Sequence, residues 1–215
     1  PLGLDFGQPV LRFYQCLFYL WNVAVHLVTG VGLITVHNLT TVLCFALSPF
    51  AYMHFLRQLG LGRLAAGLGS FASLLSVAAF GNSFEAYHAA GIVTQAMGGL
   101  FFPWFMGSFV GLLHGRSHPA TVALLFALAF LSHAMAAVFA VFSGAVYFLV
   151  VPVGGRAMWK RLAAFCVLGA ALVSFWALPF IQHTTTERPV PDSIVRGQAR
   201  TFWAGASLAL LATER

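Results

Sequence analysis

The sequence predicts an all-α polytopic transmembrane helical bundle, and three features of its composition support this fold class. Hydrophobic residues make up 60% of the 215 residues, charged residues make up only 7%, and the mean hydropathy is +0.88. A soluble domain usually carries about 25% charged residues. Because so few charged side chains cannot cover a water-exposed surface, most of the outer surface must contact lipid.

The apolar runs have the length of membrane spans. A helix needs about 20 apolar residues to cross a hydrocarbon core of roughly 30 Å. Backbone polar groups find no water in lipid, so these runs are expected to be helices, about six to seven in number, rather than strands of a barrel. The candidate runs are residues 13–32, 39–56, 64–80, 99–114, 119–151 and 162–181.

The fifth run, residues 119–151, is too long for one ordinary crossing and carries Ser132 and His133 near its middle. Two short spans and one long, broken helix are both open, and we favour two spans. In the fourth run, Gly107 and Gly111 have the spacing that lets helix backbones approach closely. This spacing predicts tight helix packing and carries no further functional meaning.

Three segments differ from the spans in composition. In residues 81–98, polar side chains are interspersed among apolar and aromatic ones, and such a composition suits an interfacial helix or a re-entrant turn. Residues 182–201 are polar, contain two prolines and are expected to form a loop. A further apolar segment starts within residues 202–215, and the chain begins at Pro1 without an initiator Met. We therefore interpret the chain as a piece of a longer protein.

The net charge of +6 does not indicate a nucleic-acid partner, because the basic residues lie in short breaks between apolar runs. Such placement fits membrane topology and anionic lipid. The positive-inside rule puts these breaks in the cytoplasm. If the fifth run crosses twice, the last three basic breaks can all lie in the cytoplasm, and residues 81–98 and 183–201 lie outside. The same arrangement puts residues 1–12 inside. The basic residues in the breaks are Arg57, Arg63, Arg116, Arg156, Lys160 and Arg161.

Neither the cysteines nor the histidines have the spacing of a resident metal site. Cys16, Cys44 and Cys166 stand alone in apolar segments, so we expect small core residues rather than metal ligands or disulfides. His114 and His118 are four residues apart, but Pro119 opposes the continuous helix that a shared metal ion would need.

The order of several motifs resembles a known family. The Gly-x-Pro element of GQPVLRFY comes first, followed by FLRQLGLGRLAAGLGS, GIVTQAMGGLFFPWFMG, LSHAMAA and SFWALPF. In this order they resemble the polytopic glycosyltransferases of the GT-C superfamily, especially the bacterial membrane proteins labelled 6-pyruvoyl-tetrahydropterin synthase-related. The resemblance covers most of residues 7–181.

The resemblance implies transfer of a sugar from a polyprenyl-phosphate-linked donor to an acceptor on the extracytoplasmic side of the bacterial inner membrane. Membrane lipid and the lipid-linked donor would be the partners, and the oligomeric state stays open. Residues 1–12 would end an extracytoplasmic loop. The catalytic acid of the family usually lies further upstream, which leaves Asp5 as the candidate within this chain. A divalent ion such as Mg²⁺ or Mn²⁺ often holds the phosphate leaving group in such transfers.

Six residues are predicted to border the donor site. A guanidinium at Arg12 can bind a lipid-linked phosphate through paired, charge-assisted hydrogen bonds. Anchoring at headgroup depth explains Arg12 and Tyr14 equally well, because both side chains bridge apolar and wet zones. The predicted residues are Arg12, Tyr14, Glu85, His88, Gln95 and His133.

Each of the remaining candidates also has a structural explanation. Glu85 and His88 share one face of a helix and suit acceptor or phosphate binding, or they form a pair at headgroup level without a ligand. His133 lies among apolar residues, where an ionisable group is costly and is a functional candidate by default. A neutral His133 bonded to a carbonyl or to Ser132 is the structural alternative.

Two other classes of protein compete with the transferase. A non-enzymatic membrane protein, such as a transporter subunit or an assembly scaffold, would use the same polar residues for packing or transport. A haem-binding bundle would need two histidines on facing helices, and the sequence shows no clear spacing of that kind.

Overall fold

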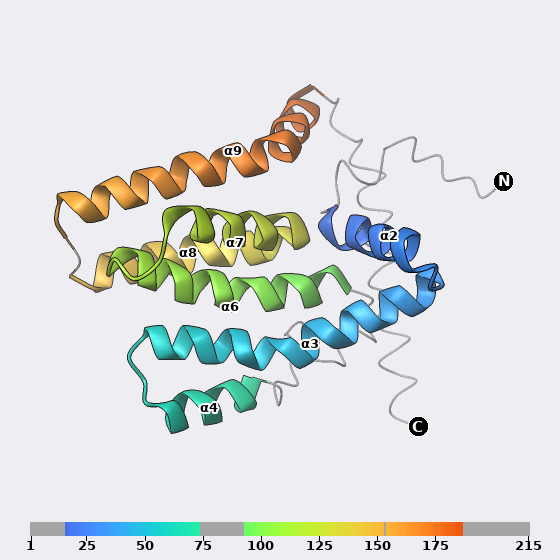
Figure 1. Cartoon of the computed structure of the whole chain (residues 1–215). Helices are drawn as coiled ribbons and strands as arrows, with labels where there is room; N and C mark the ends of the chain where they lie inside the picture. Colours follow the sequence, from blue (N-terminus) through green and yellow to red (C-terminus); the bar gives the residue numbers. More distant parts are fainter. Residues whose placement is uncertain (1–15, 74–92, 153, 187–215) are drawn as a thin grey trace, which may run out of the picture. The chain divides into compact units, whose positions relative to one another are not determined.

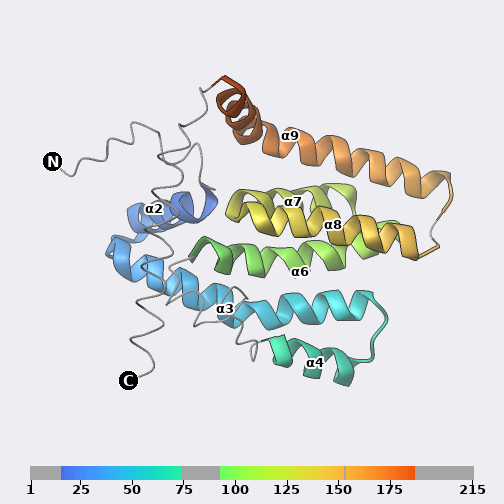
Figure 2. The same cartoon turned by 180° about the vertical axis from the view of Figure 1, so that it is seen from behind.

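The computed structural model describes residues 16–73, 93–152 and 154–186, and every regular element in these residues is helical. The arrangement is shown in Figures 1 and 2. The helices are α2 (Leu17–Thr29), α3 (Leu33–Gln58), α4 (Arg63–Ala72), α6 (Val93–Leu113), α7 (Pro119–Ser132), α8 (Ala134–Val150) and α9 (Arg156–Thr186). The predicted all-helical fold is confirmed for these residues.

Three of these helices are long and apolar enough to cross a membrane: Leu33–Gln58, Thr94–Leu113 and Arg156–Pro179. In the most apolar 18-residue stretch of each helix, 83% of the second helix is buried, but only 17% of the first and 6% of the third. Apolar helices that expose most of their surface are expected to face lipid. Helix α6 is therefore the central helix of the bundle, and α3 and α9 are peripheral to it.

The described residues up to Leu178 belong to one compact unit, and a second unit begins at Pro179, within α9. Proline lacks the backbone N–H that an inner helical turn donates, so this position interrupts the hydrogen-bond ladder. The predicted loop of residues 182–201 differs from the structure at its start, because residues 182–186 form the last turn of α9. The rest of this loop, the predicted elements 1–12 and 202–215, and most of residues 81–98 lie outside the described residues.

The first unit has two hydrophobic clusters along α6. The cluster near the C-terminal end of α6 includes Phe105, Phe109 and Leu112 and reaches Met158 on α9. The cluster near its N-terminal end includes Met97 and Leu100 with residues of α2 and α3, among them Cys44. Cys16 and Cys44 are buried, as predicted, but Cys166 is exposed, so the prediction of a core residue is wrong there.

Residues 93–98 differ from the sequence prediction of an interfacial segment, because they form the first turns of α6. Thr94, Ala96 and Met97 are buried. The small side chains of this stretch let α6 lie close to its neighbours. A Cβ atom added to Gly98 would lie 2.8 Å from the Cβ atom of His133.

The tight packing predicted for the glycine pair of α6 is confirmed at Gly107. A Cβ atom at this position would lie 2.5 Å from His54 Cδ2 and 2.9 Å from Phe55 Cα, so the backbones of α3 and α6 approach closely here. The His54 Nε2 and Ser108 Oγ atoms, 3.3 Å apart, form a hydrogen bond across the same contact. At Gly111 the nearest neighbours are Ser117 and Gln58.

The fifth apolar run forms two helices, α7 and α8, that run in opposite directions in both views (Figures 1 and 2). Helix α7 starts at His118, whose ring nitrogen Nδ1 accepts a hydrogen bond from the Ala120 N–H, with Pro119 in the first turn. This is a favourable helix start, because proline needs no hydrogen-bond partner there. The run therefore forms two separate helices rather than one long helix, and that each of them crosses the membrane stays a prediction.

All six cations of the described residues lie at one end of the unit, where α3, α6 and α8 end and α4, α7 and α9 begin (Figures 1 and 2). Two of them join neighbouring elements. Arg116 Nη2 donates to the Gln58 carbonyl at 3.1 Å, and Arg161 Nε donates to the Leu112 carbonyl at 3.1 Å. We call this end the cationic end, and the positive-inside rule predicts that it faces the cytoplasm.

Candidate functional site

The predicted site residues divide into two groups. Gln95, near the start of α6, and His133, between α7 and α8, are described by the structure. The other candidates lie outside the described residues: Asp5, Arg12, Tyr14, Glu85 and His88. The candidate site is therefore built from the elements around Gln95 and His133.

His133 forms the turn of the α7–α8 hairpin. Its backbone is extended, with φ −159° and ψ 121°, and its N–H donates to the Ala129 carbonyl at 3.0 Å. Its own carbonyl accepts from Ala136 N at 3.0 Å and so starts α8. The backbone of His133 thus ends one helix and begins the next.

The imidazole of His133 does not have the bonding that its structural explanation requires. Ser132 Oγ donates to the Leu128 carbonyl one turn earlier, which is a typical use of a serine hydroxyl within a membrane helix. Within the described residues, neither ring nitrogen of His133 has a hydrogen-bond partner. The ring is half-buried and retains its hydrogen-bonding capacity.

The structure brings Gln95 and His133 to neighbouring turns. Gly98 packs directly against the His133 Cβ atom, and Gln95 lies one turn before Gly98 on α6. Positions three apart share a helix face, so Gln95 is on the side of α6 that meets the hairpin turn. A bulkier residue than glycine at position 98 would separate the two elements.

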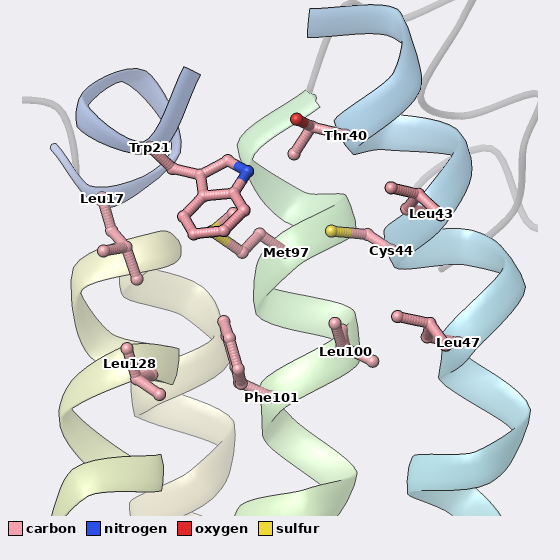
Figure 3. Close-up of a pocket in the computed structure, with 10 residues that line it drawn as sticks. All are labelled: Leu17, Trp21, Thr40, Leu43, Cys44, Leu47, Met97, Leu100, Phe101 and Leu128. Carbon is pink, nitrogen blue, oxygen red and sulfur yellow. The ribbon is translucent and has the colours of Figure 1, made fainter. Parts of the chain in front are cut away.

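A pocket of about 370 Å³ opens between α2, α3, α6 and α7 (Figure 3), and neither Gln95 nor His133 is among the residues that line it. Small-molecule sites in proteins have volumes of roughly 300–1,000 Å³. Its walls are almost wholly apolar. The lining residues are Leu17, Trp21, Thr40, Leu43, Cys44, Leu47, Met97, Leu100, Phe101 and Leu128.

The few polar atoms of the pocket gather at one end of it. The Trp21 indole nitrogen and the Thr40 hydroxyl lie at the same end, while Leu47 and Leu128 lie toward the other (Figure 3). Thr40 Oγ1 donates to Asn22 Oδ1 at 2.8 Å, and both side chains are buried. The Asn22 Nδ2 group has no partner among the described residues. An unpaired buried donor costs about 1–3 kcal/mol, so an added acceptor would be stabilising here.

The pocket lies in the half of the unit that is remote from the cationic end. Its α6 residues and all of its α3 residues except Leu47 belong to the N-terminal halves of these helices, which run toward the cations. Leu128 belongs to the C-terminal half of α7, which runs away from the cations. The pocket also opens sideways, since Leu43 and Leu47 are 57% and 41% exposed. A hydrocarbon chain can enter such a pocket from the bilayer.

Sequence inspection did not identify the pocket residues. Trp21, Cys44, Met97 and Leu128 carry no chemical signature, because leucine, methionine and aromatic side chains serve equally as core, lipid-facing and pocket-lining residues. Trp21 alone gives a hint, because indole rings favour the membrane interface.

The described residues can bind a ligand, and His133 among them can also donate or accept a proton. None of them is a carboxylate, and the described ranges contain no group of three or more His, Cys, Asp or Glu side chains that could hold a metal ion. No family model matches this chain, and neither does any curated protein or solved structure. Function is therefore inferred from the residues and their geometry.

Proposed function

We propose that this chain is part of an integral membrane glycosyltransferase of the GT-C type, which takes a sugar from a polyprenyl-phosphate carrier. The observation that carries the proposal is the laterally open, apolar pocket of about 370 Å³ between α2, α3, α6 and α7, in the half of the unit remote from the cationic end. An isoprenoid chain needs apolar walls along its length and polar groups only at its phosphate end, and the pocket offers this distribution.

The position of the pocket supports a reaction on the extracytoplasmic side of a bacterial inner membrane. It lies away from the cationic end, which the positive-inside rule assigns to the cytoplasm. Leu17, the first residue of α2, lines the pocket, and Arg12 and Tyr14 precede it closely in the sequence. Glu85 and His88 precede α6 in the same manner. These residues would act on the phosphate and the acceptor.

Six crossings would fit this orientation and would remove the conflict over residues 1–12. Helix α2 has 13 residues and is about 20 Å long at 1.5 Å per residue, and α4 and α7, with 10 and 14 residues, are likewise shorter than the hydrocarbon core of roughly 30 Å. The choice between them therefore rests on the positive-inside rule and not on length. If α2 stays in the outer half of the bilayer, α3, α4, α6, α7, α8 and α9 provide six crossings. Residues 1–12 then lie outside, where a donor site requires them.

The catalytic base and any divalent metal ion would be held by residues outside the described ranges. A Mg²⁺ or Mn²⁺ ion would stabilise the phosphate leaving group. Within the pocket half of the unit, His133 and Gln95 would orient the donor through hydrogen bonds. His133 can donate or accept, because its two ring nitrogens differ in protonation.

Transfer is tested with the full-length protein in liposomes that contain radiolabelled polyprenyl-phosphate sugars. We expect label to move to an acceptor, and Arg12→Ala or Glu85→Ala to lower the rate by about tenfold or more, because phosphate binding or proton transfer is lost. Activity that survives both substitutions would contradict the site assignment. No transfer from any donor would favour the non-enzymatic alternative, a transporter subunit or assembly scaffold.

Pocket binding is tested separately with a polyprenyl phosphate that carries a photoreactive group on its isoprenoid chain. Leu128→Trp fills the pocket and is expected to lower labelling of α6 peptides by about tenfold, as steric exclusion removes most of the apolar contact. Leu124→Trp is the matched control, because Leu124 lies one turn away on α7, is 51% exposed and does not line the pocket. Equal labelling in both variants would show that the chain binds elsewhere.

A further inference from the structure

A second apolar cavity lies between α9 and the helices α6, α7 and α8, and it is independent of the proposed donor pocket. Its volume is about 520 Å³. Helix α9 contributes one face of it, with Leu162, Phe165, Cys166 and Gly169 among the lining residues. In both views the ribbon of α9 stands apart from α7 and α8 over this stretch (Figures 1 and 2).

The cavity has the form of a groove with aromatic walls and a floor of small residues. Phe165 contacts Phe105 and Phe126, with ring centroids 6.0 Å apart in each pair, and so holds α9 on the bundle. Ala140 and Gly144 leave space on the α8 side. The groove is open, since Val141 and Cys166 at its edge are exposed. A single hydrocarbon chain matches this shape and polarity.

The groove leads to the cationic end. Leu162 lines it, and the preceding residue, Arg161, uses its Nε atom for the Leu112 carbonyl. The Arg161 Nη atoms have no hydrogen-bond partner among the described residues. Arg156 and Lys160 are exposed close by in the first turns of α9. Three cations thus lie within the first two turns of α9, directly before the groove residue Leu162.

An interfacial aromatic side chain marks the boundary between groove and cations. Trp159 is 55% exposed, and its ring stacks edge-on against Phe148, which lines the groove, with centroids 5.4 Å apart. Exposed indole rings favour the headgroup level of a bilayer. The described residues include no carboxylate, so no described group neutralises these cations.

We propose that this groove binds one anionic phospholipid, with an acyl chain along Phe105, Phe165 and Cys166 and the phosphate at Arg156, Lys160 and Arg161. Charge complementarity decides for a lipid over an apolar helix, because the groove joins an unneutralised cluster of cations at its end. Juxtamembrane cations attract anionic headgroups. The bound lipid would occupy the space between α9 and the bundle and so fix α9 in place.

The test is native mass spectrometry of the delipidated protein titrated with phosphatidylglycerol or phosphatidylcholine. We expect one phosphatidylglycerol to be retained about tenfold more tightly than phosphatidylcholine, and Arg156→Gln with Lys160→Gln to remove this preference. Arg63→Gln, which removes a cation of α4 instead, is expected to leave the preference unchanged. Equal retention of both lipids by the wild type would overturn the proposal.

The acyl-chain part of the site is tested by filling the groove. Cys166→Trp is expected to lower retention of both lipids about tenfold, whereas Val167→Trp, on the neighbouring lipid-facing position, is expected to behave as wild type. Competition by glycerol phosphate would show that the site takes a soluble anion and would overturn the lipid assignment. Detection of a dimer that the Cys166→Trp substitution dissociates would also overturn the lipid assignment, because a second copy of the chain would then cover the groove.

Discussion

Replacement of Gly107 by alanine is expected to destabilise the bundle by about 3 kcal/mol, the upper range for overpacking a core. The added Cβ atom would lie 2.9 Å from Phe55 Cα and 2.5 Å from His54 Cδ2. His54 can rotate only by losing its bond to Ser108. The Phe55 Cα atom belongs to the backbone, so the whole of α3 must shift.

The measurement is thermal unfolding of the purified protein in detergent. A loss of this size corresponds to a fall in Tm of roughly 8 °C for a chain of this length. Gly67→Ala in α4 is the control, because a Cβ atom there meets nothing within 4 Å. Alanine is the better helix former, so this variant should be unchanged or more stable by about 0.5–1 kcal/mol. Equal Tm values for Gly107→Ala and wild type would mean that α3 and α6 do not meet at Gly107.

This contact also shows what sequence can predict in a membrane bundle. The Gly107-x-x-x-Gly111 spacing predicted close packing without naming the partner. The partner, α3, follows from tertiary structure alone, as nothing in residues 33–58 marks His54 and Phe55 as contact positions. Small residues indicate where another helix can approach the backbone, but the sequence of the approaching helix need not contain a corresponding pattern.

The candidate site was predictable only in part, for a similar reason. The motif order drew attention to Gln95 and His133, and the structure brings both to neighbouring turns. The pocket between α2, α3, α6 and α7 was not predictable. Trp21 lines it and Leu20 does not, yet both are 52% exposed and both belong to one apolar run. In lipid, apolar side chains are equally suited to core, pocket and surface.

The break at His133 was foreseen from length, whereas its geometry was not. Residues 119–151 exceed one crossing, but no glycine or proline stands at positions 132–134 to stop a helix. The structure ends α7 with the extended backbone of His133, one residue after a serine that bonds its own helix. A serine side chain can compete locally with the helical hydrogen bonds, and His133 packs against Gly98 at this break.

The hairpin leads to an all-or-none prediction about topology. In a chain freed of its native cysteines, single cysteines at Leu61, His114 and Gly154 are each expected to react with a membrane-impermeant maleimide from the cytoplasmic face only. These positions lie in or beside the three turns at the cationic end. Val31→Cys, between α2 and α3, is the control and should react only from the opposite face.

Reaction of His114→Cys and Gly154→Cys from opposite faces would contradict the hairpin, because residues 119–151 would then cross once as a long helix. The energy of moving charges across the bilayer also predicts that the three turns lie on the same side. Moving one Lys or Arg through the bilayer centre costs about 2.5–3.5 kcal/mol, and a membrane potential adds about 2.3 kcal/mol per charge for each 100 mV. Arg57 and Arg63 flank the first turn, Arg116 lies in the second, and Arg156, Lys160 and Arg161 follow the third. Moving any one of these turns to the outer face would incur that cost, and the cations of the other two turns favour the cytoplasmic face. All three turns are therefore expected on the same side of the membrane.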